Sequence, residues 1–254
     1  MKPSITHQVA IRQALAAALT LLCMTQATQA QVTAEQCGPM SQPMQYGPYD
    51  YRIDKDKLPI VEIAHFTAQV ESLLRGQSTT SFAGDISYTL QRFPNHHRAL
   101  MSVMRMVERK MPAVRELLRP PECFFERAVR WRQDDVVARM LYAKFLADQR
   151  RKPEAINQLE ITATYAKDFV LTHRNIGLLL IEMGEFDRAL VQAHKLLIMG
   201  DPDTRLRDSL TRAGKWREPV LTPTPAASAA DSTAMPASAA APASAVAPAS
   251  AVAN

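Results

Sequence analysis

The sequence lacks the features that mark several common classes of protein. It has only three cysteines in 254 residues, and no two of them form the CxxC pair of a zinc site. The net charge is +5, and no cluster of five or more lysines or arginines provides the basic patch of a nucleic-acid-binding protein. The GxSxG, HExxH and P-loop motifs are also missing. No local motif therefore indicates catalysis, zinc binding or nucleic-acid binding.

The first thirty residues have the pattern of a secretory signal peptide. Lys2 and Arg12 precede an apolar run of eleven residues, Ala14 to Met24, and small and polar residues then lead to Ala30. The run is too short for a membrane span, which needs roughly 20 residues. We expect residues 1–30 to be removed, with cleavage after Ala27 as the alternative, and a soluble protein to be exported.

Export changes what the cysteines predict. Cys23 leaves with the signal peptide, and Leu22 occupies the preceding place, where lipid-anchored bacterial proteins usually have a small residue. Cys37 and Cys123 remain, and an even number of cysteines in an oxidising compartment predicts a disulfide. A metal site is the weaker alternative. The bridge would close a loop of about 85 residues, for which chain entropy gives at most roughly 4–5 kcal/mol.

A pattern of alanines and aliphatic residues occurs twice at a fixed interval. The string RKPEAINQLEITA is followed 34 residues later by GEFDRALVQAHKLL, so that Ala155 corresponds to Ala189. In both strings the apolar residues recur every three or four positions, which predicts helices with one apolar face. Self-similarity at this interval is typical of stacked pairs of antiparallel helices.

The boundaries between units support the same interval. Pro94, Gln133, Lys167 and Asp201 stand at corresponding places, separated by 39, 34 and 34 residues. The first unit is therefore five residues longer than the others. We expect its extra residues to form a proline-containing loop within ERKMPAVRELLRPP, residues 108–121, between the two helices of the unit.

Residues 31–93 contain no repeat, and we expect an irregular segment with short helices. Residues 45–62 are rich in tyrosine and proline and should be extended. A short helix should cover residues 67–76, with Thr67 as its N-cap, and Asp85 should cap the helix that leads to the first boundary.

The C-terminal part should contain one more helix and then a tail. The helix follows Asp203, its candidate N-cap, and ends at Gly214, and it would cover the open end of the array. Residues 219–254 consist almost entirely of small residues and proline, and such a segment cannot bury enough apolar surface to offset its ordering entropy. We expect it to be disordered.

These residues resemble the tetratricopeptide repeat family in three units over about residues 97–203, within a repeat region of residues 94–218. The resemblance is strongest in the last unit. The family's aromatic residue at the fourth position is missing, because Leu100, Arg139 and His173 stand there. The resemblance implies an all-α superhelix (a TPR-like solenoid) whose concave groove binds protein segments. The strings GPYDYR, FPNHHRAL and AGKWRE also resemble a group of secreted repeat proteins of Gram-negative bacteria, which implies no activity.

The family's register places the groove on the first helix of each unit. It assigns to the groove Arg98, Met101, Arg105, Glu108 and Arg109, then Val137, Met140, Lys144, Ala147 and Asp148, then Leu171, Arg174, Leu178, Ile181 and Glu182. Five of these residues are basic and three are acidic, over an apolar floor. An extended partner segment with apolar anchors and some acidic character, or with a free C-terminal carboxylate, would suit them. The alternative is that the charges only solvate the helices and that the N-terminal segment covers the apolar members.

The histidines provide the alternative function. His96 and His97 are adjacent and point about 100° apart on a helix, so they cannot share a metal as an i, i+4 pair would. A structural role is favoured. The alternative is an envelope enzyme or metal-binding protein built around His65, His96 and His97 with an acid such as Asp85. The favoured hypothesis is an exported, non-catalytic scaffold without a cofactor, monomeric or weakly associating, that binds a protein or peptide segment.

Overall fold

The computed structural model describes residues 32–40 and 46–219, and these ranges contain helices and turns but no strand. The described chain is therefore all-α, as the sequence predicts. The predicted signal peptide and residues 220–254 of the predicted tail lie outside the described residues. Contacts divide the chain into residues 1–217 and residues 218–254, and the arrangement below concerns the first unit.

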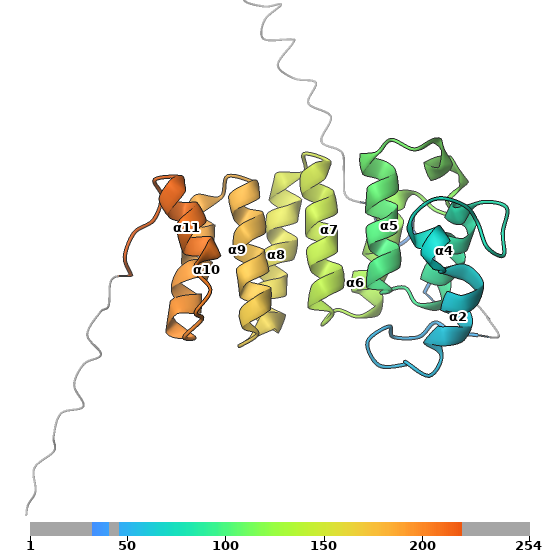
Figure 1. Cartoon of the computed structure of the whole chain (residues 1–254), viewed down its shortest axis with the longest axis horizontal. Coiled ribbons are helices and arrows are strands. Elements are labelled where there is room, and N and C mark those ends of the chain that lie inside the picture. The colour runs from blue at the N-terminus through green and yellow to red at the C-terminus, as the bar shows by residue number, and fades with distance from the viewer. Residues whose placement is uncertain (1–31, 41–45, 220–254) are drawn as a thin grey trace, which may run out of the picture. The chain divides into compact units, whose positions relative to one another are not determined.

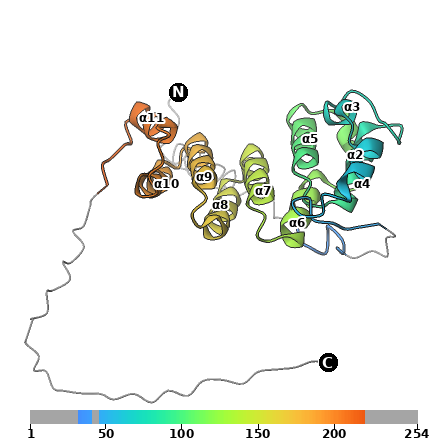
Figure 2. The same ribbon diagram turned by 60° about the horizontal axis from the view of Figure 1, so that its bottom comes forward.

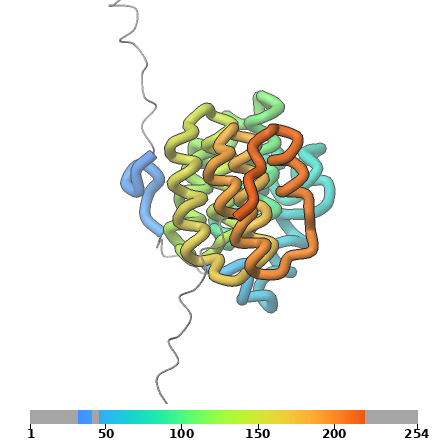
Figure 3. Tube along the Cα trace, turned by 90° about the vertical axis from the view of Figure 1, so that its left-hand side faces the viewer, coloured from blue at the N-terminus to red at the C-terminus, as the bar shows by residue number. Residues whose placement is uncertain are grey.

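The helices of this unit form two rows (Figures 1 and 2). In chain order they are α2 (Leu58–His65), α3 (Ala68–Glu71), α4 (Phe82–Arg92), α5 (His97–Glu108), the 3-10 helix η1 (Pro112–Glu116), α6 (Pro121–Trp131), α7 (Val136–Asp148), α8 (Lys152–Ala166), α9 (Val170–Glu182), α10 (Phe186–Ile198) and α11 (Arg205–Arg212). We call α5, α7 and α9 the front row and α6, α8 and α10 the back row. Helix α7 packs most extensively on α8, and α9 on α10. Figure 3 looks along the rows from the α11 end.

Fully buried alanines stand at corresponding places in the back row. Ala128 of α6, Ala155 of α8 and Ala189 of α10 each have no exposed surface, and each belongs to a cluster of buried apolar side chains. Small side chains at a contact allow neighbouring helices to approach closely. The three segments thus have similar surroundings, as a common repeat register requires.

The helix ends follow from local chemistry. The carboxylate of Asp135 accepts hydrogen bonds from the backbone N–H groups of Val137 (3.1 Å) and Ala138 (3.0 Å), and so caps α7. Pro153 lies in the first turn of α8, where its missing N–H is harmless. Gly184 has a φ of +77° between α9 and α10, a conformation that glycine adopts at little cost. The sequence pattern predicted both the proline and the glycine.

The N-terminal segment is more helical than predicted. The expectation of an extended chain over residues 45–62 is wrong at its end, because α2 begins at Leu58 and packs on α4. The helix predicted over residues 67–76 is only the four residues of α3, and the hydroxyl of Thr67 makes no capping bond. Ser81, rather than Asp85, caps α4 by accepting from the Ala83 N–H at 3.2 Å. Burial of Val61 and Val70 stabilises these short helices, whose branched residues have weak intrinsic propensity.

The predicted disulfide is present. Cys37 and Cys123 are joined with a Cα–Cα distance of 5.0 Å across 86 residues of sequence, so the bridge fixes residues 32–40 to α6. Buried Arg127 of α6 donates from the same nitrogen to the carbonyl oxygens of Cys37, Gly38 and Pro39, the last at 2.7 Å. Burial lowers the pKa of Arg127 to about 10.

The five extra residues of the first unit form a short, anchored turn. The predicted loop between α5 and α6 contains η1, and Leu117 directly after η1 is buried. The backbone N–H of Leu118 donates to the hydroxyl of Ser87 on α4 at 3.1 Å. The insertion therefore has fixed contacts with α4.

Gly177 allows α11 to lie against α9. A Cβ atom at this position would stand 2.4 Å from one methyl carbon of Leu206 and 3.0 Å from the other. Leu206 is buried, so its side chain has little room to move away. The close approach at Gly177 therefore determines where the terminal helix packs.

We expect Gly177→Ala to destabilise the protein, although alanine is the better helix former. Overpacking costs about 1–3 kcal/mol, and the gain in helix propensity returns up to about 1 kcal/mol. Chemical denaturation of Gly177→Ala, Leu206→Ala and the double variant checks this. The double variant should lose less free energy of unfolding than the sum of the single losses, because Leu206→Ala removes the clash. Strictly additive losses would contradict the contact.

Candidate binding clefts

A cleft with aliphatic walls lies between α7 and α9 of the front row, and its volume is about 390 Å³. It is lined by Val137, Met140, Leu141 and Lys144 from α7 and by Asn175, Leu178, Leu179 and Glu182 from α9. Five of these residues stand at positions that the repeat register assigns to the groove. The structure thus brings together Val137, Met140, Lys144, Leu178 and Glu182.

Lys144 connects the two walls of this α7–α9 cleft. Its ammonium group forms ion pairs with Glu182 across the cleft at 3.0 Å and with Asp148 one turn along α7. Burial disfavours the charged ammonium, but the hydrogen bonds to both carboxylates outweigh this effect and raise the pKa of Lys144. Lys144 is therefore positively charged and already bound to two acids.

Asn175 supplies an uncommitted polar group to the same cleft. It is exposed, and its side chain makes no hydrogen bond with any other residue in the described ranges. A carboxamide has two donor hydrogens and an acceptor oxygen, which match the carbonyl and N–H groups of a peptide backbone. The repeat register does not assign Asn175 to the groove, and nothing in the local sequence distinguishes it.

A second cleft, of about 490 Å³, lies between α5 and α7. It is lined by Met104, Val107, Glu108, Lys110, Phe145, Asp148 and Gln149. Glu108 and Asp148 were predicted for the groove. Met104, Val107 and Phe145 were not, because their spacing places them on the sides of the helices that face the core, and the cleft reaches down to them.

The N-terminal segment occupies the space beside the basic residues of α5. Arg98 donates to both carboxylate oxygens of Glu71 on α3, with Nε at 3.0 Å from Oε1, and pairs with Glu62 at 3.4 Å. This contact with Arg98 lowers the pKa of Glu71. Arg105 donates to the Glu71 carbonyl oxygen at 3.1 Å. The predicted groove is thus partly filled from within at α5, although Met101 remains 38% exposed.

The basic groove residue of α9 is also paired internally. Arg174 forms ion pairs with Asp201 and with Asp203, the latter at 3.0 Å, and its side chain is only 13% exposed. It therefore ties α9 to the segment before α11. Leu171, one turn earlier on α9, is 61% exposed.

Three remaining groove predictions lie outside both clefts. Ala147 and Ile181 are partly buried and pack against the apolar core. Arg109 is exposed at the end of α5 and lines neither cleft. The family register therefore locates the α7–α9 cleft well and the edges of the groove poorly.

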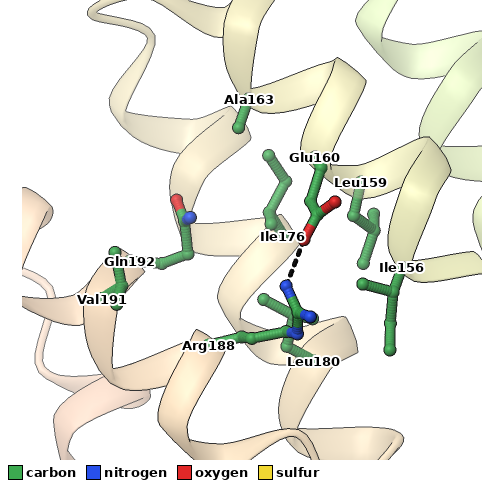
Figure 4. A pocket seen from close by; sticks show the side chains of 9 residues that line it. All are labelled: Ile156, Leu159, Glu160, Ala163, Ile176, Leu180, Arg188, Val191 and Gln192. Atoms are coloured by element: carbon green, nitrogen blue, oxygen red, sulfur yellow. Dashed lines mark hydrogen bonds and ion pairs between the residues drawn. The ribbon is translucent and has the colours of Figure 1, made fainter. Parts of the chain in front are cut away.

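The back row contains a separate pocket of about 270 Å³ between α8 and α10 (Figure 4). Ile156, Leu159 and Ala163 of α8 face Val191 of α10 across a floor that α9 provides. An ion pair between Glu160 and Arg188 crosses the opening. The sequence predicted these apolar residues as core and gave no indication of a pocket.

The three histidines of the alternative hypothesis contact three different carboxylates. His65 Nδ1 lies 2.8 Å from Asp85, and His97 Nε2 lies 2.9 Å from Asp135. Asp85 is buried and also accepts hydrogen bonds from the backbone N–H groups of residues 77–79, so it anchors that loop. Among the described residues no three His, Cys, Asp or Glu side chains are grouped as metal ligands would be.

His96 is buried and has a defined protonation state. Its Nδ1 accepts a hydrogen bond from the Ala99 N–H at 3.2 Å and so caps α5, while its Nε2 lies 3.0 Å from a carboxylate oxygen of Glu62. An acceptor Nδ1 carries no proton, so the ring is neutral and donates from Nε2. Burial lowers the pKa of His96. This histidine therefore stabilises the contact between α2 and α5.

A buried carboxamide joins the N-terminal turn to the start of α7. Asn95 donates to Asp50 at 2.7 Å and to Asp135 at 2.8 Å, and its oxygen accepts from the Tyr51 N–H at 3.0 Å. Hydrogen bonds from Arg52 and Asn95 overcome the opposing effect of burial and lower the pKa of Asp50. The sequence marked Asn95 only as part of a repeat boundary.

Comparison with known proteins gives no match, since no family model fits the sequence and no curated protein or solved structure is similar to it. Within the described ranges, no helix has the length and apolar character that crossing a membrane requires.

His96 should make stability depend on pH. The folded-state pKa lies below the ordinary value of 6.5, so the unfolded chain binds a proton more readily than the folded protein. The stabilisation is complete above pH 6.5 and is lost as the pH falls below it, by at most about 1.4 kcal/mol per pH unit. Denaturation of the wild type and of His96→Asn between pH 8 and pH 5 measures this difference.

His96→Asn is the matched reference because asparagine keeps an N-cap acceptor and does not titrate. His65 and His97 titrate in both proteins, so their contributions cancel in the comparison. The wild type should lose stability relative to the variant as the solution becomes acidic. A difference between the two proteins that stays constant with pH would refute the role of His96.

Proposed function

We propose that this protein is an exported, non-catalytic scaffold of the tetratricopeptide repeat type that binds a protein or peptide segment along its front row. The α7–α9 cleft is the principal site. The proposal depends above all on one observation, which is that residues assigned to the groove by the repeat register line this cleft together with an unpaired carboxamide.

Several features support the repeat type. The helix pairs α5–α6, α7–α8 and α9–α10 follow the boundaries expected from the 34-residue interval, and the buried alanines of the back row correspond. Helix α11 covers the end of the array with Leu206 and Leu210 inward. The disulfide supports export, because such bridges form in oxidising compartments.

The chemistry of the α7–α9 cleft suits an extended segment. Met140 and Leu178 offer apolar surface for one or two aliphatic side chains, and methionine adapts its shape to different partners. Asn175 would pair with a backbone N–H or carbonyl group of the segment, which contributes affinity without depending on its sequence. Binding would then rest on apolar anchors with a main-chain contact between them.

The proposal predicts that the apolar floor contributes most of the affinity. Peptides selected from a random display library on the wild-type protein should bind Met140→Ser/Leu178→Ser at least tenfold more weakly, a loss of about 1.4 kcal/mol or more. Fluorescence polarisation measures the affinities, and circular dichroism verifies that the variant remains folded. Substitution of the paired arginines is a poorer test, because Arg174→Glu would break its internal ion pairs.

Val191→Ser/Ile198→Ser is the control, because both residues are exposed on α10 of the back row. It removes similar aliphatic surface and should leave peptide affinity unchanged. If the α7 and α9 substitutions had no effect, or if the control reduced affinity equally, the site would not be the α7–α9 cleft.

A further inference from the structure

The arginines predicted to attract an acidic partner have their charges balanced within the protein. Arg98 is bound to the carboxylate of Glu71, and Arg174 lies between two aspartates. A guanidinium group that already binds carboxylates would have to give up these contacts to bind a ligand. The positive charge counted from the sequence is therefore not available to a partner.

The carboxylates of the α7–α9 cleft are more exposed than its ammonium group. The side chain of Lys144 is 33% exposed, whereas Glu182 is 58% exposed and Asp148 is 40% exposed. One lysine between two carboxylates leaves a local net charge of −1, and the four carboxylate oxygens have acceptor capacity beyond the three N–H groups of Lys144. A ligand that approaches this cleft meets acceptors first.

The α5–α7 cleft adds to this imbalance. Glu108 is exposed and makes no ion pair with another described residue, and Lys110 is the only cation among the residues lining this cleft. Along both clefts, Glu108, Asp148 and Glu182 outnumber Lys110 and Lys144. Apolar walls of low dielectric strengthen the effect of such charges on a bound ligand.

We propose that the two clefts beside α7 select a segment that carries a lysine or arginine next to its aliphatic anchors. The inference rests on the proposed function and names the class of its ligand. It reverses the acidic character expected from the sequence. The ligand cation would bind the acceptor positions of Asp148 and Glu182 that Lys144 leaves unoccupied, while the aliphatic side chains contact Met140 and Leu178.

Two pools of nine-residue synthetic peptides test the inference. Both pools carry leucine at the third and fifth positions, which face the same side of an extended chain. The sixth position is lysine in one pool and glutamate in the other, and the rest are glycine, serine and threonine. By fluorescence polarisation at low ionic strength, the lysine pool should bind at least threefold more tightly. In 0.5 M NaCl the difference should shrink, because salt screens exposed charges.

Lys144→Gln gives the most discriminating result. If the ligand is basic, Lys144 competes with it for Asp148 and Glu182, so the variant should bind the lysine pool at least twofold more tightly than the wild type does. An acidic ligand would depend on Lys144 and lose affinity. Lys152→Gln is the matched control, because it removes a back-row ammonium group that is paired with Glu185 at 2.7 Å, and it should leave the affinity unchanged.

The outcomes separate this inference from the proposed function. Tighter binding of the glutamate pool, equal binding of both pools, or weaker binding of the lysine pool by Lys144→Gln would overturn the inference while the binding cleft stands. If neither pool binds the wild-type protein, the proposed cleft fails, and the inference fails with it. Circular dichroism and thermal unfolding show whether each variant remains folded.

Discussion

Close contact between helices through alanine and glycine determines how this chain stacks its hairpins. Ala128, Ala155 and Ala189 are fully buried at corresponding places of the back row, and Gly177 lets Leu206 of α11 lie against α9. Larger side chains at these places would force the helices apart, because protein interiors have few voids. The front row derives its spacing from these contacts. The α7–α9 cleft, which lies between two front-row helices, therefore depends on small residues that do not touch a ligand.

Internal ion pairs then determine the electrostatic character of the front row. The fold engages Arg98, Arg105 and Arg174 in contacts with the N-terminal segment and with the residues before α11. Lys144 is shared between two carboxylates. The N-terminal segment is a permanent part of the fold, because Val70 of α3 is fully buried and contributes to the apolar core. The surface left for a partner is consequently apolar and slightly acidic.

The sequence predicted the paired helices and the bridge of Cys37 with Cys123, because periodic patterns and cysteine parity are local or compositional signals. It missed α2, whose eight residues include a proline and branched side chains and are helical because they pack on α4. It identified five of the eight residues of the α7–α9 cleft and missed Asn175. The pairing of Arg98 with Glu71 and of Arg174 with Asp201 joins residues 27 positions apart, and no local pattern indicates such partners.

Site-specific crosslinking tests the account most directly. A photoreactive amino acid is placed at Asn175, in the α7–α9 cleft, or at Val191, on the back row, in protein expressed with its own leader in a Gram-negative host. After irradiation, crosslinked segments are identified by mass spectrometry. The account predicts that position 175 crosslinks to a defined partner segment with aliphatic residues next to lysine or arginine, and that position 191 does not. Crosslinks from position 191 to that segment, with none from position 175, would contradict it.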